Sequence, residues 1–185
     1  MPETTYLIAD THFGDAAILR YENRPFQSVQ EMDEAIIRNW NSTVKEEDTV
    51  FVLGDFSAYA LQKTAGICQR LNGHKYLIMG NHDTASESDY LACGFAHVSR
   101  YPIIYDNFWM LSHEPLYINR NMPYANIFGH VHDNPMYRTD SPQSFCACVE
   151  RIGYTPISFS EVRQRIMDKY PDPTDSANDS GETAP

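Results

Sequence analysis

Asp, Asn and His recur in this sequence directly after short apolar runs, and their side chains are ones that bind metal ions. The residues are Asp10, His12, Asp55, Asn81, His113, His130 and His132. Carboxylate and amide oxygens together with imidazole nitrogens suit Mn²⁺, Fe, Zn²⁺ or Ni²⁺. A pair of such ions about 3.5–4 Å apart needs a bridging carboxylate, and Asp55, which follows an apolar run and a glycine, is placed to supply it. The residue types therefore indicate a centre for two divalent ions.

The apolar runs before these residues predict the elements that position them. Short runs rich in β-branched and aromatic residues that end at Gly or Asp are typical of buried strands. Such runs occupy residues 6–9, 49–53, 76–79, 108–111 and 126–128. Ligand sites in open α/β sheets form at the carboxyl ends of strands. We therefore expect the polar residues behind these runs to share one site.

Helical patterns alternate with the first three predicted strands. Ser28 and Glu31 form a capping-box signature, and Met32, Ile36 and Trp40 follow on one helical face. Further helices are expected over residues 61–71, over 87–93 and from about residue 160 onward. The order strand, helix, strand, helix, strand implies parallel strands joined by crossover helices, which is an α/β fold.

The composition predicts one acidic globular domain followed by a tail. The chain has 185 residues, 42% hydrophobic and 21% charged, with a formal net charge of −11. We expect a folded domain over residues 1–170 and a disordered acidic tail over 171–185, which has no bulky apolar side chain. An acidic protein is a poor electrostatic partner for long nucleic acid, although bound cations would still attract a small anionic substrate.

No run reaches the roughly 18 apolar residues of a membrane span, and no signal peptide is evident, so a cytoplasmic location without a membrane partner is expected.

The cysteines do not form the pattern of a disulfide framework or a zinc site. They are Cys68, Cys93, Cys146 and Cys148. The run 144–149 is typical of a strand, and a spacing of two places Cys146 and Cys148 on one of its faces. We interpret them as small buried hydrophobic residues.

Taken together and in order, the ligand motifs resemble those of the calcineurin-like metallophosphoesterase superfamily. The pattern of that family is Asp-x-His, Gly-Asp, Gly-Asn-His-(Asp/Glu), His and Gly-His-x-His. Here the blocks fall at residues 10–12, 54–55, 80–83, 113 and 129–132. The resemblance spans residues 6–132 and continues to about residue 166. It implies a layered α-β-β-α sandwich with mixed sheets and a phosphoric ester hydrolase with a binuclear metal centre.

The resemblance also implies a role for each residue of the motifs. One ion would be held by Asp10, His12, Asp55 and His132, and the other by Asp55, Asn81, His113 and His130. A hydroxide shared by the two ions would attack phosphorus in line. His82 matches the family's catalytic histidine, which would protonate or hydrogen-bond to the departing oxygen. Manganese is the expected metal, with Fe, Zn²⁺ or Ni²⁺ as alternatives.

Two segments are similar to a small prokaryotic and phage branch of the superfamily. They are Asp-Thr-His-Phe-Gly at residues 10–14 and Asn-Arg-Pro-Phe at 23–26. Members of this branch continue the first segment with His, whereas this chain has Asp15, so a metal or phosphate contact made by that His is in question. The protein phosphatase branch continues its Gly-Asp block as Gly-Asp-x-x-Asp-Arg-Gly, but residues 54–60 here lack the second Asp and the Arg, which argues against a Ser/Thr protein phosphatase. Whether Asp83 orients His82 stays open.

The function favoured by the sequence is a two-metal phosphodiesterase acting on a small phosphodiester or nucleotide, with a phosphomonoesterase less favoured. The alternatives are a catalytically weak metal-binding scaffold of the same fold and a nuclease on short nucleic acid. The complete ligand set and His82 argue against the scaffold, and the length and acidic body argue against the nuclease. Arg24 is a candidate for binding the substrate phosphate, or it pairs on the surface with Glu22 or Asp15. The oligomeric state stays open.

Overall fold

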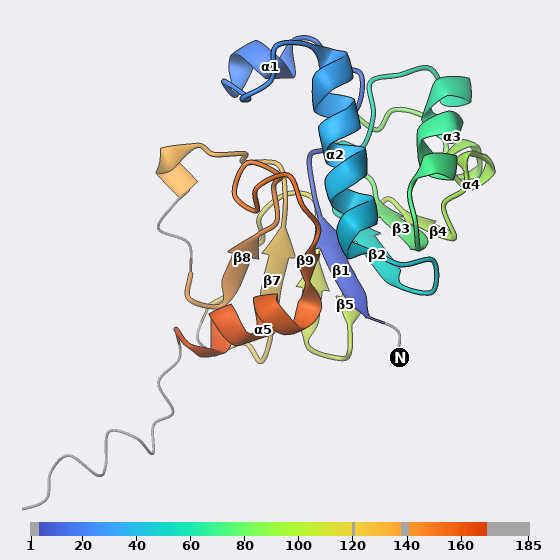
Figure 1. Ribbon diagram of the computed structural model, residues 1–185. Helices are drawn as coiled ribbons and strands as arrows, with labels where there is room; N and C mark the ends of the chain where they lie inside the picture. Colours follow the sequence, from blue (N-terminus) through green and yellow to red (C-terminus); the bar gives the residue numbers. More distant parts are fainter. Residues whose placement is uncertain (1–3, 120, 138–140, 170–185) are drawn as a thin grey trace, which may run out of the picture.

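Two mixed β-sheets lie at the centre of the computed structural model, which describes residues 4–119, 121–137 and 141–169 (Figure 1). The first sheet has the strand order β4-β3-β2-β1-β9. Its strands are β1 Thr5–Ile8, β2 Thr49–Val52, β3 His74–Ile78, β4 His97–Ser99 and β9 Ile157–Ser158. Strands β1 to β4 run parallel, and β9 runs antiparallel to β1. The carboxyl ends of β1, β2 and β3 therefore lie at the same end of the sheet.

The second sheet has the strand order β5-β6-β7-β8. Its strands are β5 Ile103–Tyr105, β6 Trp109–Leu111, β7 Ala125–Phe128 and β8 Ser144–Cys146. Strands β6, β7 and β8 are parallel, and β5 is antiparallel to β6. Each sheet thus combines parallel strands with one antiparallel edge strand. The predicted α/β class with mixed sheets is confirmed.

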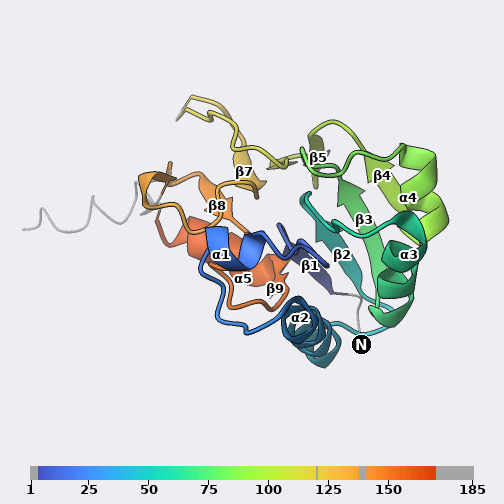
Figure 2. The same ribbon diagram turned by 90° about the horizontal axis from the view of Figure 1, so that it is seen from above.

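Helices cover the face of the first sheet that is turned away from the second (Figure 2). They are α2 Val29–Thr43, α3 Leu61–Arg70 and α4 Glu87–Cys93. Ser28 begins α2 as predicted, because its Oγ accepts a hydrogen bond from the N–H of Glu31 at 3.1 Å. The Glu31 carboxylate accepts a bond from the N–H of Gln27 at 2.7 Å, one residue before the partner that a capping box would use. Gly94, with φ of 109°, ends α4 in the left-handed conformation that glycine favours.

Three further helical segments complete the described fold. They are α1 Ile18–Tyr21, the 3-10 helix Pro135–Tyr137 and α5 Phe159–Met167. Helix α5 packs against β1, β8 and β9, with Val162 and Ile166 buried. In the described parts of the chain, no helix is long and apolar enough to cross a membrane. The acidic tail predicted over 171–185 lies outside the described residues.

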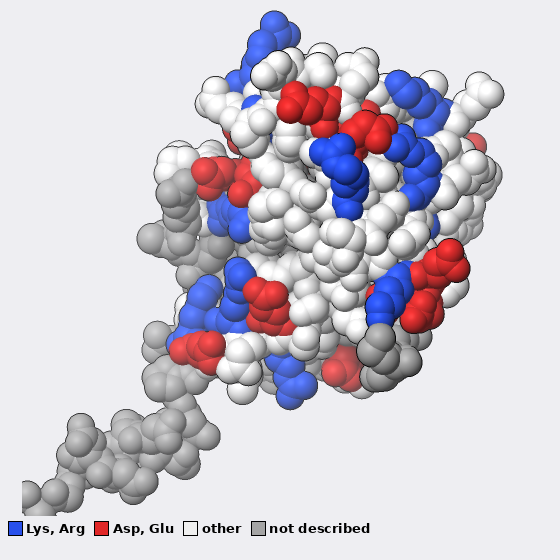
Figure 3. Space-filling model, viewed as in Figure 1, with Lys and Arg blue, Asp and Glu red and all other residues white. Residues whose placement is uncertain are grey.

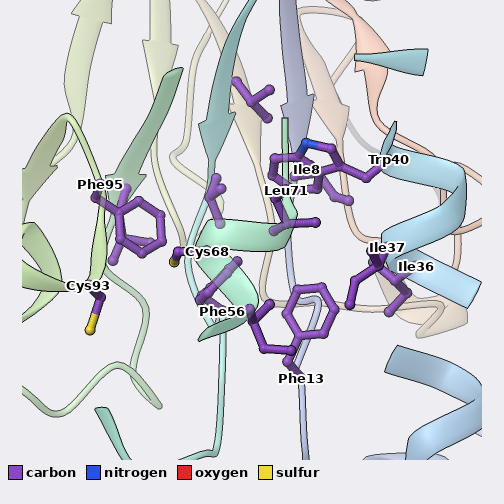
Figure 4. Packing of buried hydrophobic residues seen from close by; sticks show 14 of the residues in the cluster. Ile8, Phe13, Ile36, Ile37, Trp40, Phe56, Cys68, Leu71, Cys93 and Phe95 are labelled. Atoms are coloured by element: carbon purple, nitrogen blue, oxygen red, sulfur yellow. The ribbon is translucent and has the colours of Figure 1, made fainter. Parts of the chain in front are cut away.

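The alternation of side chains along the first sheet divides the core into two clusters. Ile8 faces the helices, where it joins Ile36, Trp40 and Phe56 (Figure 4). Leu7 faces the second sheet and joins the other cluster, between the two sheets. Truncation of a fully buried aliphatic residue to alanine typically costs about 2–5 kcal/mol. Because both clusters use β1, the strand that leads to Asp10 and His12 is fixed from both faces.

The chain between residues 144 and 150 crosses from the second sheet to the first. Strand β8 ends at Cys146, before the end of the strand that the sequence predicted over 144–149. The N–H of Ala147 still bonds to the carbonyl of Phe128 at 2.7 Å, but the N–H of Val149 bonds to the carbonyl of Ala9 at 3.1 Å. This crossing brings the side chains of residues 148 and 150 behind the carboxyl end of β1.

Candidate metal centre

The predicted ligands converge at the carboxyl ends of strands from both sheets. Asp10 and His12 follow β1, Asp55 follows β2, and the others follow β3, β6 and β7. Their side chains form two groups whose ligand atoms all lie within 4.8 Å of one another: Asp10 with His12 and His132, and Asp55 with His113 and His130. The structure thus brings together residues that are up to 122 positions apart in the chain, in the grouping that the motif resemblance implied.

The backbone at the ligands is strained. The φ angles are positive at Asp10 (58°), His12 (48°), Asp55 (53°), His130 (70°) and His132 (46°). Non-glycine residues in this region cost on the order of 1–3 kcal/mol each, and such strain gathers at functional sites. The preceding glycines permit the tight approach of the loops, since a Cβ at Gly129 would lie 2.5 Å from Oδ2 of Asp10. Holding these side chains together therefore lowers the stability of the fold.

The imidazole rings are oriented by acceptors behind them. His113 Nδ1 lies 2.9 Å from the carbonyl oxygen of Leu53. His132 Nδ1 lies 3.0 Å from Oε1 of Glu150, and His12 Nδ1 lies 3.5 Å from Oδ2 of Asp15. An acceptor at Nδ1 favours the tautomer that leaves the Nε2 lone pair for a metal ion. Three rings therefore present Nε2 to the centre.

His130 presents its other ring nitrogen. Its Nδ1 lies 3.0 Å from Oδ1 of Asn81 and 3.1 Å from Nε2 of His113. The same Asn81 oxygen lies 3.0 Å from Nε2 of His113. These atoms surround one point beside Asp55, as an Asn-His-His-Asp ligand set requires.

Asp55 stands between the two groups. Its Oδ2 lies 3.6 Å from Nε2 of His12 and 3.4 Å from Nε2 of His113. Its Oδ1 accepts the backbone N–H of His82 at 2.8 Å. A carboxylate oxygen in reach of one histidine from each group has the position of a bridging ligand.

The buried polar atoms of the first group fit a cation. Oδ1 of Asp10 and Nε2 of His12 are buried without a hydrogen-bond partner in the described structure. Leaving buried polar atoms unpaired costs about 1–3 kcal/mol each, which a coordinated ion would offset. Burial raises the pKa of Asp10 to about 6 and lowers the pKa of His12 to about 4. His12 is therefore neutral near pH 7, the form that binds metal. The residues present fit a divalent ion on each side of Asp55.

His82 lies at the open side of the centre. Its ring is exposed, and its centroid is 5.3 Å from that of His12. The neighbouring Asp83 does not orient this ring. The buried carboxylate of Asp83 instead accepts the backbone N–H groups of Asp55 at 2.7 Å, Gly80 at 2.9 Å and Phe56 at 3.1 Å. Asp83 thus ties the loops after β2 and β3 together.

Arg24 is engaged inside the protein. Its side chain is 0% exposed, and it donates to the carbonyls of Asp10 at 2.7 Å and Thr11 at 3.0 Å. It also pairs with Glu150 at 2.6 Å. Neither a direct grip on a substrate phosphate nor a surface pair with Glu22 or Asp15 fits these contacts. Asp15 instead accepts the N–H groups of Ala17 and Ile18 at the start of α1.

Two side chains behind the centre belong to none of the ligand motifs. Glu150 contacts His132 and Arg24, as given above. The thiol of Cys148 lies 3.1 Å from Oδ2 of Asp10 and 3.2 Å from the thiol of Cys146. Both thiols are buried beside Phe128 and Val131, as expected of small hydrophobic residues. Glu150 does follow the predicted strand over 144–149, as the ligands follow theirs, but neither residue belongs to a ligand motif, so only their position in space reveals these contacts.

Two Asp–His groups joined by one aspartate, at the strand ends of a two-sheet α/β fold, define the class of metallophosphoesterases. The chain matches the model of the calcineurin-like phosphoesterase family over residues 4–145, and it belongs to this family.

Several known proteins are similar to this chain. An uncharacterized protein of Methanocaldococcus jannaschii is 36% identical over 170 residues, which cover 87% of this chain and 90% of that protein. The gene 66 protein of Mycobacterium phage L5 is 33% identical over 82 residues, covering 43% of this chain and 39% of that protein. The crystal structure of an Aquifex aeolicus protein of unknown function matches with a TM-score of 0.68 and 28% identity, covering 88% of this chain and 99% of the other. The crystal structure of a Pseudomonas putida nuclease matches with a TM-score of 0.49 and 27% identity, covering 69% of this chain and 61% of the other.

Proposed function

We propose that this protein is a two-metal phosphodiesterase that acts on a small phosphodiester or nucleotide. The observation that carries the proposal is the position of Asp55 between two complete Asp–His groups, with the exposed ring of His82 beside them. Two divalent ions held there would lower the pKa of a bound water to near neutrality. They would also offset negative charge on the phosphate oxygens.

The side chains of the centre then have different roles. Asp55 sets the spacing of the two groups, because its Oδ2 lies 3.6 Å from His12 and 3.4 Å from His113. His82 has no ligand role. Its backbone N–H is tied to Asp55 at 2.8 Å, which holds the exposed ring at the mouth of the centre. From there its imidazole donates a proton or a hydrogen bond to the departing oxygen of the ester.

The ligand set supports Mn²⁺ as the metal. One group offers a carboxylate and two imidazoles, and the other adds the amide oxygen of Asn81. Mixed oxygen and nitrogen ligands without thiolate suit Mn²⁺ or Fe, with Zn²⁺ and Ni²⁺ as alternatives. Metal analysis of the purified protein decides among them.

The charge distribution favours a small substrate. The net charge is −11, and basic and acidic side chains are interspersed on the face drawn in Figure 3. Long nucleic acid binds through clustered Lys and Arg. A short nucleic acid remains the second candidate, and a metal-binding scaffold the third. A cytoplasmic location stays a prediction from the sequence.

A substrate panel tests this proposal. Protein stripped of metal and reloaded with Mn²⁺, Zn²⁺, Ni²⁺ or Fe²⁺ is assayed on p-nitrophenyl phosphate, its bis-diester, cyclic nucleotides, dinucleotides and single-stranded oligonucleotides. We expect metal-dependent hydrolysis, faster on diesters than on the monoester, and none by Asp55→Asn prepared in parallel. Preference for oligonucleotides would favour the nuclease. No hydrolysis with any metal would leave the scaffold as the function.

A further inference from the structure

A buried ion pair lies directly behind the Asp10–His12–His132 group. The guanidinium of Arg24 and the carboxylate of Glu150 are 2.6 Å apart, with 0% and 5% of the two side chains exposed. The pair joins positions 126 residues apart in the chain. Removing two charges from water costs several kcal/mol per ion, and the attraction within such a pair often fails to repay it. Stability alone is therefore a weak reason for this pair.

Glu150 controls the orientation of one ligand ring. Its Oε1 accepts both Nε of Arg24 at 2.8 Å and Nδ1 of His132 at 3.0 Å. A carboxylate at Nδ1 fixes the ring and the tautomer and makes Nε2 a stronger ligand. Nε2 of His132 lies 3.7 Å from Oδ1 of Asp10, the buried oxygen that has no hydrogen-bond partner in the described structure. The ring is therefore aimed at the place where an ion would join His132 to Asp10.

Arg24 controls the backbone that carries the other two ligands. Its Nη2 donates to the carbonyl of Asp10 at 2.7 Å, and its Nη1 donates to that of Thr11 at 3.0 Å. Asp10 and His12 both have positive φ, so this short segment is strained. One guanidinium thus holds the Asp10–His12 turn and, through Glu150, the His132 ring.

In the Asp55–His113–His130 group, Asp83 accepts the backbone N–H of Asp55 at 2.7 Å, but the histidine rings have weaker support. The Nδ1 of His113 faces a neutral carbonyl, that of Leu53 at 2.9 Å. His130 is exposed and turns Nδ1 toward the centre. Neutral acceptors raise the basicity of a ligand less than a carboxylate does.

We propose that Arg24 and Glu150 are positioning residues that make the Asp10–His12–His132 group the tighter of the two ion sites. The inference rests on the proposed function only in that both groups bind ions. Neither side chain touches the ion or the substrate. Both act through His132 and the Asp10–His12 turn.

Stepwise ion binding is the first test. Calorimetry with Mn²⁺ on metal-free protein should resolve two steps in the wild type. Glu150→Ala should weaken the tighter step by about 10–100-fold, the usual effect of losing such a support, and leave the weaker step within a few-fold. Glu150→Gln should have a smaller effect, because its amide oxygen still accepts from Nδ1. Arg24→Lys keeps the charge but loses the fork of donors. It should weaken the tighter step more than Glu150→Gln does and less than Glu150→Ala does.

An exposed ion pair provides the matched control. Arg70 and Glu34 are also 2.6 Å apart, but their side chains are 46% and 48% exposed, on α3 and α2. Glu34→Gln should change neither step. If Glu150→Ala leaves both affinities unchanged, or weakens both equally with a matching fall in melting temperature, the positioning role is rejected and the pair is structural.

Nitrogen NMR of the histidine rings separates this inference from the proposed function. In metal-free protein, at a pH where the rings are neutral, His132 should carry its proton on Nδ1 in the wild type and in Glu150→Gln, and should populate both tautomers in Glu150→Ala. This readout needs neither bound metal nor activity. A mixed tautomer in the wild type would overturn the inference even if the protein proves to be a phosphodiesterase.

Discussion

The two ligand groups use the same kinds of side chain but lie in different surroundings. Asp10 and His12 are buried, His132 is partly buried, and a charged pair lies behind them. In the other group Asp55 and His113 are buried, but His130 and the adjoining Asn81 are exposed. Ligand types set which ions fit, and the surroundings set how firmly each ion is held. The enclosed group is suited to retain its ion, and the open group to meet the substrate.

The difference extends to the protons of the metal-free protein. Burial lowers the pKa of His12 to about 4, so that ring is neutral near pH 7. Burial also opposes the protonation of His113, but its hydrogen bond to Asp55 and the charges of Asp10 and Asp55 raise its pKa to about 9. An ion that binds His113 must therefore displace a proton. The pKa of His132 is raised as well, so an ion entering the first group also has a proton to displace there.

The largest effect is expected from the residue that the two groups share. Asp55→Asn removes the bridging carboxylate, so both ions should be weakened and hydrolysis should fall to the background rate. Metal content after dialysis and turnover are the measurements. Asp48→Asn is the control, since Asp48 is buried at the opposite end of β2 and bonds to the N–H groups of Thr4 and Lys45. Two ions retained by Asp55→Asn would contradict the bridging role.

The next largest effect is expected at the mouth of the centre. His82→Ala should keep both ions and lose roughly 10²–10⁴ in kcat on a diester with a poor leaving group. The loss should be smaller with p-nitrophenolate, which departs without protonation, and KM should change little. His74→Ala, which removes an exposed histidine at the start of β3, is the matched control. Equal rates for wild type and His82→Ala on every substrate would contradict a catalytic role for His82.

Removing one ligand from each group sharpens the comparison. His130→Ala and His132→Ala should each leave one ion bound. The ion left in His130→Ala occupies the enclosed group, so a chelator chase should extract it about 10-fold more slowly than the ion left in His132→Ala. Equal extraction rates would mean that burial and the charged pair give the first group no advantage.

The smallest effect concerns pH and the metal-free protein. A histidine with a folded-state pKa of about 9 adds stability that is full below its unfolded value near 6.5 and is lost as the pH rises through 9. The pKa of His132 is also raised, against the effect of burial, by its hydrogen bond to Glu150, so it acts in the same direction. The melting temperature in chelator should therefore fall from pH 7 to 8.5. The fall should be smaller in His113→Asn and in metal-loaded protein, where an ion replaces the proton.

Local sequence was enough to predict much of the fold. Strands β1, β2 and β3 are evident as apolar runs. Ser28 marks a helix start by its side-chain hydrogen bond, and Gly94 marks a helix end by its backbone conformation. The short strands β4, β5 and β9 were not predicted, because their two or three residues do not belong to longer apolar runs of the kind that indicated β6 and β8. Helix α1 was missed for a similar reason. It has only four residues, and the carboxylate of Asp15 accepts the backbone N–H of Ala17 at its start.

The sequence by itself was enough to name the candidate ligands and the family that their order indicates, and the tertiary structure decided how these side chains are supported. Asp, Asn and His motifs at strand ends are local features, so the candidate ligands and His82 could be named from order and spacing. Glu150 could not, because it reaches His132 and Arg24 only where the chain crosses from the second sheet to the first. For Arg24 the sequence left open phosphate binding and a surface ion pair, and the fold instead places its side chain inside the protein. Such contacts depend on the packing of segments far apart in the chain, which no local pattern records.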